Sequence, residues 1–487
     1  MKKIISAFLA VLMLSGCVLM VSCNKEGKGD ESGTSEAITT APVHDDSEDF
    51  TVPEDLDYGQ KTCNVLTFNS IVPEFGDVTE DMGDAVNAAL VTRDRYTEDY
   101  LGVKLNVISR NGQYADRLEY SDHISMSVLS GLGLYDVIGS YSLIPVSLSV
   151  RGVLQDLNET DYLDFSKKWW ASFVYNSCTI HDKTYFMSGD ISTNLLYQMQ
   201  IVAFNSIKLK DNMINEADIY TLVDEGQWTL DRFLEIASNI STPDSEGNWS
   251  ADSFYAVGMQ DANMLDSFYI ASGMKLFSIE DDNLGVSSDI LSNKVLSLYD
   301  KVYNAIYTEH IIKMPQGRST FLDGKELFCV IPVYALKTTL SEMSDPIGIL
   351  PFPKYDESDS YRTLLSSPHA QYYIPTDAND VNASSAVLET LAYASYQYVT
   401  PEVFYSIMKF RYSKDENSSR MFDIIREGST TDLGILSYML FDYGIEPASM
   451  FRNALILGIT NWTSNYKNKF ENAMESVVNT LNDLYHS

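Results

Sequence analysis

The sequence has few positive charges for its length. It contains 34 Lys and Arg residues against 68 Asp and Glu residues, a formal net charge of −34 over 487 residues. A surface of this sign repels phosphate backbones, so we expect no nucleic-acid partner. It also disfavours docking on anionic lipid through a basic patch. Neutral ligands, cations and basic partners remain open, and we interpret most of these carboxylates as serving solubility.

The residue patterns of common catalytic and metal sites are missing. The six histidines are scattered, without HxH or HxxxH spacing, which disfavours a metal centre. The chain has no GxSxG motif and no glycine-rich phosphate loop. Carboxylate pairs for glycoside hydrolysis could be drawn in many places, so their presence carries little weight. We therefore predict no catalytic residue, no metal site and no cofactor.

Cysteine is also scarce, with five residues in the chain. Cys63, Cys178 and Cys329 are odd in number, widely spaced and without a CxxC pair. Each has apolar or β-branched neighbours, which favours a buried structural thiol. A disulfide between two of them remains open.

No continuous apolar run reaches the roughly 20 residues that a membrane-spanning helix needs. The chain opens with Met1-Lys2-Lys3, and an apolar run from Ile4 to Leu14 follows. A charged start before a short apolar segment is typical of an export signal. The sequence therefore predicts a protein that works outside the cytoplasm.

Two cysteines follow that apolar run, and each is a candidate for lipidation. Leu14-Ser15-Gly16-Cys17 is the better match to a lipobox, but cleavage there leaves the apolar Val18 to Val21 beside the lipid. Cys23 is followed at once by the polar stretch Asn24 to Asp30. The stretch up to about Tyr58 has too few apolar residues to fold. We predict residues 1–22 as signal peptide, Cys23 as the lipidation site and residues 23–60 as the lipidated cysteine with a disordered tether.

The folded part begins with alternating strand and helix patterns. Glycine after a helical pattern and short apolar runs give the boundaries. The expected order is strand Asn64–Asn69, helix Met82–Leu101, strand Val103–Ile108, helix Ile124–Leu132 and strand Tyr135–Ile138. Such an order predicts a parallel sheet covered by helices. Ligands of open α/β sheets bind beyond the carboxyl ends of the strands, which points to the loops at Asn69-Ser70 and Ser140-Tyr141.

Further along, short apolar runs predict strands at Tyr255–Gly258, Leu327–Ile331 and Ile347–Leu350. Trp228 precedes a helix with Thr229 as its expected N-cap, and we interpret Trp228 as a packing residue. From Val381 onward the pattern is mainly helical, through Ala386–Tyr398, Pro401–Phe410 and Tyr466–Leu484.

Tyrosine is abundant, with 31 residues beside 21 Phe and 5 Trp. A tyrosine combines a flat apolar face with a hydroxyl group, which suits stacking on a sugar ring. We interpret most of these tyrosines as half-buried packing residues, but their number favours a carbohydrate ligand.

Four stretches occur in the order of one known family. They are Tyr135-Asp-Val-Ile138 with Gly152-Val-Leu-Gln-Asp-Leu157, Trp228-Thr-Leu-Asp-Arg-Phe233, Phe321-Leu-Asp-Gly-Lys325, and Gly348-Ile-Leu-Pro-Phe-Pro-Lys-Tyr355. Together they resemble the extracellular solute-binding proteins of family 1, the maltose-binding-like group of ABC importers. The resemblance runs from about Lys61 to Tyr405.

The resemblance implies an α/β protein with the two-lobed type II periplasmic-binding-protein fold and a ligand cleft between the lobes. Lobe 1 is expected to comprise residues 61–195 plus 350–400, and lobe 2 residues 196–349 plus 401–487, with the first crossing near Leu195 to Gln200. It implies a monomer that captures a sugar or oligosaccharide by hinge closure and delivers it to the permease subunits of an ABC importer. The lipid would be the only contact with the membrane, at the outer face of the cytoplasmic membrane, as in Gram-positive bacteria.

The resemblance also suggests cleft positions, which come from the ends of strands and from the crossings. The expected ligand-binding residues are Asn69, Ser70, Ser140, Tyr141, Gln198, Asp261, Asn263, Asp266, Tyr334, His369 and Gln371. Tyr372 belongs to the same group as His369 and Gln371. Tyr334 falls where the family often has a stacking aromatic residue, although Pro332-Val-Tyr334 replaces the family's tryptophan-containing stretch.

Two other classes of protein stay open. One is a lipid-anchored glycoside hydrolase, which needs two carboxylates roughly 5–10 Å apart in a cleft. The other is an all-helical glycan-capture lipoprotein of the surface type, against which the strand patterns at Asn64, Val103, Tyr135 and Ile347 speak.

Overall fold

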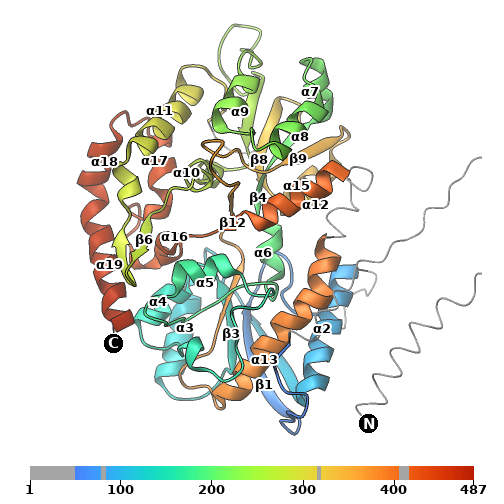
Figure 1. The fold of residues 1–487 in the computed structure, drawn as a ribbon, viewed down its shortest axis with the longest axis vertical. Coiled ribbons are helices and arrows are strands. Elements are labelled where there is room, and N and C mark those ends of the chain that lie inside the picture. The colour runs from blue at the N-terminus through green and yellow to red at the C-terminus, as the bar shows by residue number, and fades with distance from the viewer. Residues whose placement is uncertain (1–49, 78–83, 315–319, 405–415, 487) are drawn as a thin grey trace, which may run out of the picture. The chain divides into compact units, whose positions relative to one another are not determined.

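The computed structural model describes residues 50–77, 84–314, 320–404 and 416–486 (Figure 1). The chain divides into two compact units, Met1–Thr40 and Ala41–Ser487, and every described residue belongs to the second. Several predictions fall outside the described residues: the signal peptide, both candidate lipidation cysteines and the tether up to residue 49. Residues 405–410 of the predicted helix Pro401–Phe410 lie outside them too.

The first sheet has the strand order β11-β3-β1-β2. Its strands are β1 (Lys61–Phe68), β2 (Val103–Arg110), β3 (Val137–Tyr141) and β11 (Ala370–Tyr373). The first three are parallel, joined by the helices α2 (Ala85–Leu101) and α3 (Arg117–Leu129), while β11 runs antiparallel to β3. The predicted strand–helix alternation is confirmed, including the stop of α2 at Gly102, whose φ of 62° suits glycine.

The second sheet has the order β5-β8-β4-β9. Its strands are β4 (Gln200–Asn205), β5 (Tyr255–Met259), β8 (Glu326–Pro332) and β9 (Ile347–Leu350). β5 and β8 are parallel, whereas β4 runs antiparallel to both β8 and β9. All residues of β8 are buried, in keeping with the apolar run from Leu327 to Pro332. The three predicted strands of this region are confirmed, and β4 is an additional one.

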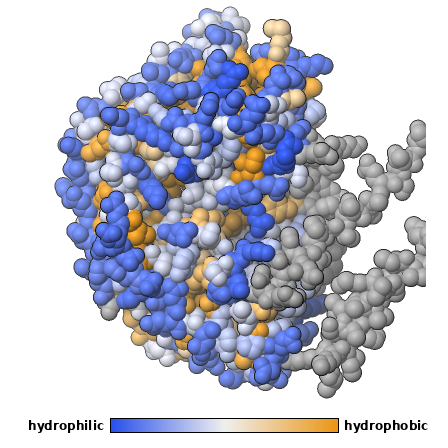
Figure 2. Space-filling view, in the orientation of Figure 1, coloured by the Kyte–Doolittle hydropathy of each residue, from blue (hydrophilic) through white to orange (hydrophobic). Residues whose placement is uncertain are grey.

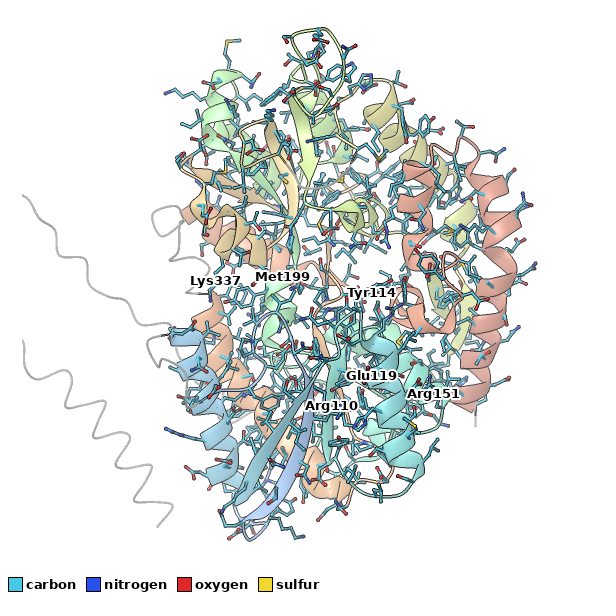
Figure 3. All side chains as sticks on the ribbon, turned by 180° about the vertical axis from the view of Figure 1, so that it is seen from behind. Arg110, Tyr114, Glu119, Arg151, Met199 and Lys337 are labelled. Atoms are coloured by element: carbon cyan, nitrogen blue, oxygen red, sulfur yellow. The ribbon has the colours of Figure 1, made fainter. Side chains whose placement is uncertain are left out.

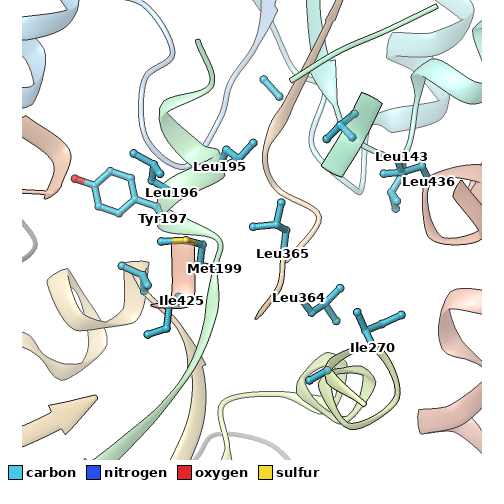
Figure 4. Packing of buried hydrophobic residues seen from close by; sticks show 14 of the residues in the cluster. Leu143, Leu195, Leu196, Tyr197, Met199, Ile270, Leu364, Leu365, Ile425 and Leu436 are labelled. Atoms are coloured by element: carbon cyan, nitrogen blue, oxygen red, sulfur yellow. The ribbon is translucent and has the colours of Figure 1, made fainter. Parts of the chain in front are cut away.

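The chain passes between the two sheets more than once. It leaves the first sheet through the short helix α6 (Thr193–Tyr197) and enters β4. It returns between β9 and β11 through β10 (Thr363–Leu364), which pairs in parallel with β12 (Ser429–Thr430). Buried apolar side chains of both crossings, among them Leu195, Met199, Leu364 and Leu365, lie in the same region (Figure 4). We call the parts built on the two sheets the first-sheet and second-sheet lobes; the residue boundaries given above for lobes 1 and 2 stay a prediction.

Helices cover the sheets. α13 (Val381–Ala394) packs against α2, and α15 (Glu416–Glu427) lies against β9 (Figure 1). The C-terminal helices α17 (Met450–Ile456), α18 (Trp462–Lys469) and α19 (Glu471–His486) follow, with α19 in contact with both β7 and α4. The remaining elements are α4 (Pro145–Val150), α5 (Ser172–Cys178), α7 (Ser206–Asp211), α8 (Glu216–Asp224), α9 (Leu230–Ala237), α10 (Asp266–Ala271), β6 (Phe277–Glu280), β7 (Asn283–Val286), α11 (Asn293–Tyr307), α12 (Tyr334–Lys337) and α16 (Leu433–Leu436).

Several packing predictions are confirmed. Cys63, Cys178 and Cys329 are all buried. The Trp228 side chain is fully buried and its Nε1–H donates to the Pro351 carbonyl at 3.0 Å, while Thr229 caps α9. Hydrophilic residues cover most of the face in Figure 2, with small apolar patches between them. In the described part of the chain, no helix combines the length and the apolar character that crossing a bilayer requires.

Candidate ligand-binding site

A cavity of about 600 Å³ lies where the carboxyl ends of the first sheet's parallel strands meet. Ile71 follows β1, Tyr114 follows β2, and Tyr141 and Leu143 mark the end of β3; all four line the cavity. Figure 3 shows Tyr114 at the border of the first-sheet lobe. Parallel strands end at one edge of a sheet, so these residues from distant parts of the sequence come together.

The second sheet contributes to the same cavity with its own carboxyl edge. Gln260 and Asp261 follow β5, and Pro332 ends β8, directly before the turn to Tyr334. Gln200 is the register partner of Pro332 across the antiparallel β4–β8 pair, so the start of β4 lies at the same edge. Both sheets therefore present strand ends to one cavity.

The crossing segments and the C-terminal region complete the lining. Gln198, at the end of α6, comes from the first crossing, and Leu364 to Pro368 come from the return. The C-terminal region adds Ile435, Tyr438, Pro447, Ala448, Met450, Phe451 and Arg452.

Three polar side chains of the lining have a buried atom without a hydrogen-bond partner among the described residues. They are Nε2 of Gln198, Oε1 of Gln260 and Oδ1 of Asp266. A buried polar atom left unpaired costs about 1–3 kcal/mol, and native proteins keep few of them. All three residues belong to the lining, and each has one polar atom that no described residue pairs. Groups of this kind suit a ligand rich in hydroxyl groups, since a hydroxyl both donates and accepts.

An ion pair stands beside these groups. The Arg452 guanidinium of α17 donates to Oδ2 of Asp266, the first residue of α10. Burial raises the pKa of the Asp266 carboxyl to about 7, against the opposing effect of Arg452, and the nearby Asp261 raises it further. Arg452 holds Oδ2, while Oδ1 is buried and has no hydrogen-bond partner among the described residues.

Tyrosine side chains supply flat surfaces. Tyr334 is half-buried in the lining, and its ring meets that of Tyr197 edge-on at 6.2 Å between centroids. The hydroxyls of Tyr114 and Tyr438 share a hydrogen bond of 2.8 Å. The Arg117 guanidinium lies over the Tyr114 ring at 3.9 Å. These rings offer the apolar faces on which a sugar ring can stack.

Six of the expected ligand-binding residues line the cavity. They are Tyr141, Gln198, Asp261, Asn263, Asp266 and Tyr334. The other five, which are Asn69, Ser70, Ser140, His369 and Gln371, do not belong to the lining.

Burial explains three of the five. Ser140 alternates with Tyr141 along β3, so its side chain faces the opposite side of the sheet, where it is fully buried. His369 and Gln371 are buried too, with their side-chain nitrogens 3.3 Å apart. Burial lowers the pKa of His369 to about 4, so the imidazole is neutral. Tyr372 is also fully buried.

The remaining two are engaged in the loop after β1. Asn69 accepts from the Gly112 amide at 3.1 Å and donates to Asn111 at 3.2 Å. Ser70 donates to the Val72 carbonyl at 2.6 Å. These bonds shape the loop whose next residue, Ile71, does line the cavity.

Sequence reasoning missed several lining residues. Gln200 and Gln260 lie within two residues of predicted ones, so a wider window around each strand end would have included them. Tyr438 and Arg452 belong to a helical region, so the positions of strand ends do not indicate them. They line the cavity because the C-terminal region packs onto it.

Comparison with known proteins supports the N-terminal signal. Residues 1–17 match the family model "prokaryotic membrane lipoprotein lipid attachment site". The match ends at Cys17, the other candidate, whereas lipidation at Cys23 stays a prediction. No curated protein matches the chain.

Solved structures with the same fold are numerous. An ABC substrate-binding protein from Listeria monocytogenes in complex with cycloalternan is 12% identical, with 86% of this chain and 99% of the other covered and a TM-score of 0.53. The galacto-N-biose/lacto-N-biose I-binding protein of an ABC transporter from Bifidobacterium longum is 13% identical, with 88% of this chain and 98% of the other covered and a TM-score of 0.55. A family 1 extracellular solute-binding protein from Bifidobacterium longum subsp. infantis is 14% identical, with 86% of this chain and 98% of the other covered and a TM-score of 0.54.

At such low identity these similarities establish the fold. The chain has the two-lobed α/β fold of extracellular solute-binding proteins, which confirms the fold class that the sequence resemblance implied.

Proposed function

We propose that this protein is the substrate-binding lipoprotein of an ABC importer and captures a sugar or oligosaccharide. The observation that carries the proposal is the cavity at the carboxyl edges of both sheets, with its unpaired polar atoms on Gln198, Gln260 and Asp266. Hinge closure around the ligand would present a closed form to the permease, without covalent chemistry.

The lining favours a carbohydrate over other small ligands. Tyr334 offers a ring face, and the amides and carboxylates offer directional hydrogen bonds to hydroxyl groups. The described residues include no group of three or more His, Cys, Asp or Glu residues that could hold a metal ion. Two of the similar structures are described with cycloalternan and with lacto-N-biose, which supports the same ligand class.

A thermal-shift screen of the full lipidated chain in mild detergent tests the ligand class. The panel contains neutral oligosaccharides, peptides and divalent metal ions. A ligand that binds only the folded state raises the melting temperature by mass action, by about 2.7 kcal/mol of added stability at a hundred times its Kd. We expect oligosaccharides to stabilise the protein, whereas stabilisation by peptides alone would overturn the proposal.

The lipid anchor is part of the proposal. A lipidated N-terminus would keep the binding protein at the outer face of the cytoplasmic membrane, beside its permease, as in Gram-positive bacteria. We predict diacylglycerol on Cys23, because a polar stretch begins directly after it. Mass spectrometry of the N-terminal peptide decides between Cys23 and Cys17, and a mature chain that begins at neither cysteine would contradict the anchor.

A second candidate function rests on two carboxylates of the same cavity, Asp261 and Asp266. A carboxyl with a pKa raised to about 7 is what a general acid in glycoside hydrolysis needs. The Asp266–Arg452 ion pair argues for a binding role, because one carboxylate oxygen is already held by Arg452. Chromatography of a stabilising oligosaccharide after incubation with the protein separates the two functions: a binding protein returns it intact, and a hydrolase returns shorter products.

A further inference from the structure

Glu74 is a buried carboxylate in the loop after β1, and it lies outside the cavity lining. Its side chain is 2% exposed, and both of its oxygens accept hydrogen bonds from the first crossing. Oε2 accepts from the Thr193 amide at 2.7 Å, and Oε1 accepts from Ser192 Oγ at 3.1 Å and Asn194 Nδ2 at 2.9 Å. The carboxylate thus binds three consecutive residues where the chain leaves the first-sheet lobe.

Asn194 strengthens the same connection. Its Nδ2 donates to the Val72 carbonyl at 2.6 Å, and its Oδ1 accepts from the Val72 amide at 3.1 Å. On the other side, the buried Arg93 of α2 donates to the Glu74 carbonyl at 2.8 Å. The loop after β1 is therefore joined to the start of α6 by hydrogen bonds at two of its residues, Val72 and Glu74.

Each of the joined segments reaches the cavity, and the return crossing is attached as well. Ile71, one residue before Val72, lines the cavity, and so does Gln198, which follows the last residue of α6. Ser192 Oγ, besides donating to Glu74, accepts from the Ala370 amide at 3.0 Å at the start of β11. Glu74, which belongs to the cavity-wall loop, is thus bonded directly to the first crossing and, through Ser192, connected to the return crossing.

We propose that Glu74 is a positioning residue of the hinge, which fixes the cavity-wall loop to the first crossing so that Ile71 and Gln198 keep one relative position. The proposal rests on the proposed function, since a hinge matters here because the lobes close on a ligand. It does not require the ligand to be known, because the coupling exists in the free protein.

Glu389 offers a matched control. It is also a fully buried glutamate of the first-sheet lobe, and burial raises the pKa of Glu389 and of Glu74 to about 7. Its oxygens accept from the indole N–H groups of Trp169 and Trp170, both at 2.8 Å, and from no residue of the first crossing. A substitution at Glu389 removes a buried carboxylate without touching the crossing.

Hydrogen exchange of the ligand-free, full-length lipoprotein in detergent tests the proposal. Glu74→Gln replaces one acceptor oxygen by an amide group that faces donors. We expect exchange about tenfold faster or more in peptides covering both 70–74 and 192–198. Glu389→Gln should leave these two segments at the wild-type rate. Unchanged exchange in Glu74→Gln, acceleration of only one segment, or equal acceleration by both variants would overturn the proposal.

A milder variant covers the case in which Glu74→Gln does not fold. Ser192→Ala removes one of the three donors, and we expect a smaller acceleration in the same two segments, with no change there again being the contradicting result. A second readout uses the oligosaccharide that stabilises the wild type most: its Kd should rise about tenfold in Glu74→Gln and stay the same in Glu389→Gln. If no oligosaccharide binds the wild type, the proposed function fails, while the exchange result still decides the role of Glu74.

Discussion

The first-sheet side of the cavity differs from the second-sheet side in the chemistry of its side chains. The strand ends of the first sheet contribute Ile71, Tyr114, Tyr141 and Leu143, which are apolar or aromatic. Those of the second sheet and the turns after them contribute four carboxylates or amides, on Gln260, Asp261, Asn263 and Asp266, together with Met264, Pro332 and Tyr334. One side mainly offers surfaces for stacking, and the other offers hydrogen-bonding atoms.

The difference fits a ligand that itself has two kinds of surface. A sugar ring has apolar C–H faces and a rim of hydroxyl groups, so it can bind between a wall of rings and a wall of polar groups. Tyr334 brings an aromatic ring to the polar side as well. The predictions below change one side at a time.

The largest expected effect comes from the charged group of the polar side. Arg452→Met leaves the Asp266 carboxyl, whose side chain is 12% exposed, without the cation that offsets its burial. Breaking a buried ion pair by removing one charge costs about 3–5 kcal/mol of stability. Urea unfolding at pH 8, where the Asp266 carboxyl with its pKa of about 7 is mostly ionised, measures the loss.

Asp261→Asn is the control for that change, since it also removes a charged group of the cavity lining. Asp261 is half-buried, and its Oδ1 accepts from the Asn263 amide at 2.8 Å, a role that asparagine can also fill. We expect a loss below about 1 kcal/mol. Equal losses in the two variants would show that the Asp266–Arg452 pair has no special place in the polar side.

The tyrosines of the two sides should respond differently to truncation. Tyr334→Ala is expected to weaken oligosaccharide binding by about 1–3 kcal/mol, with base–aromatic stacking as the nearest guide, while the fold stays largely intact. Tyr141 is 5% exposed, and Tyr141→Ala should instead cost roughly 3–5 kcal/mol of stability. Titration and thermal unfolding of both variants measure the two effects. Unchanged affinity with a large drop in melting temperature would remove Tyr334 from the binding site.

The smallest expected effect concerns pH and the first-sheet lobe, which keeps its buried carboxyls away from the cavity. Desolvation raises the pKa of Glu389 to about 7, against an ordinary value of 4.5, so the folded state binds its proton more tightly than the unfolded state does. This contribution to stability is present at low pH and is lost as pH rises from about 4.5 through about 7.

Comparison with a variant isolates this group. Between pH 5.5 and 6.5 the free energy of unfolding of the wild type should fall by about 1 kcal/mol relative to that of Glu389→Gln, which has no titrating group there. Denaturant unfolding at both pH values gives the difference. A constant difference would mean that Glu389 titrates in the folded protein as it does in the unfolded chain.

Most strands were predictable from a short apolar run, as at Ile347, or from alternation of apolar and polar residues, as at Val103. β4 was not predicted as a strand, although Ile201 to Phe204 form a short apolar run like those of its neighbours β8 and β9. What the run alone does not show is its antiparallel pairing with β8 and β9, more than a hundred residues away.

The site divides in the same way. Asp261 and Tyr334 were suggested by the family resemblance, and both line the cavity. The rule that ligands bind at the carboxyl ends of strands pointed to the loops at Asn69-Ser70 and Ser140-Tyr141. Ser140 shows the limit of that rule, since alternation along β3 turns its side chain into the core while Tyr141 reaches the cavity. Arg452 could not be predicted, because nothing near it in the sequence indicates that α17 packs beside α10.

Calorimetric titration of the most stabilising oligosaccharide tests most directly whether this cavity is the binding site. Gln260→Leu removes an unpaired acceptor of the lining, and Gln155→Leu makes the same change at a half-buried glutamine outside it. We predict that the wild type and Gln155→Leu bind with the same Kd, and that Gln260→Leu binds about five- to tenfold more weakly, as expected for one lost hydrogen bond. Equal affinity in all three proteins would contradict the placement of the ligand in this cavity.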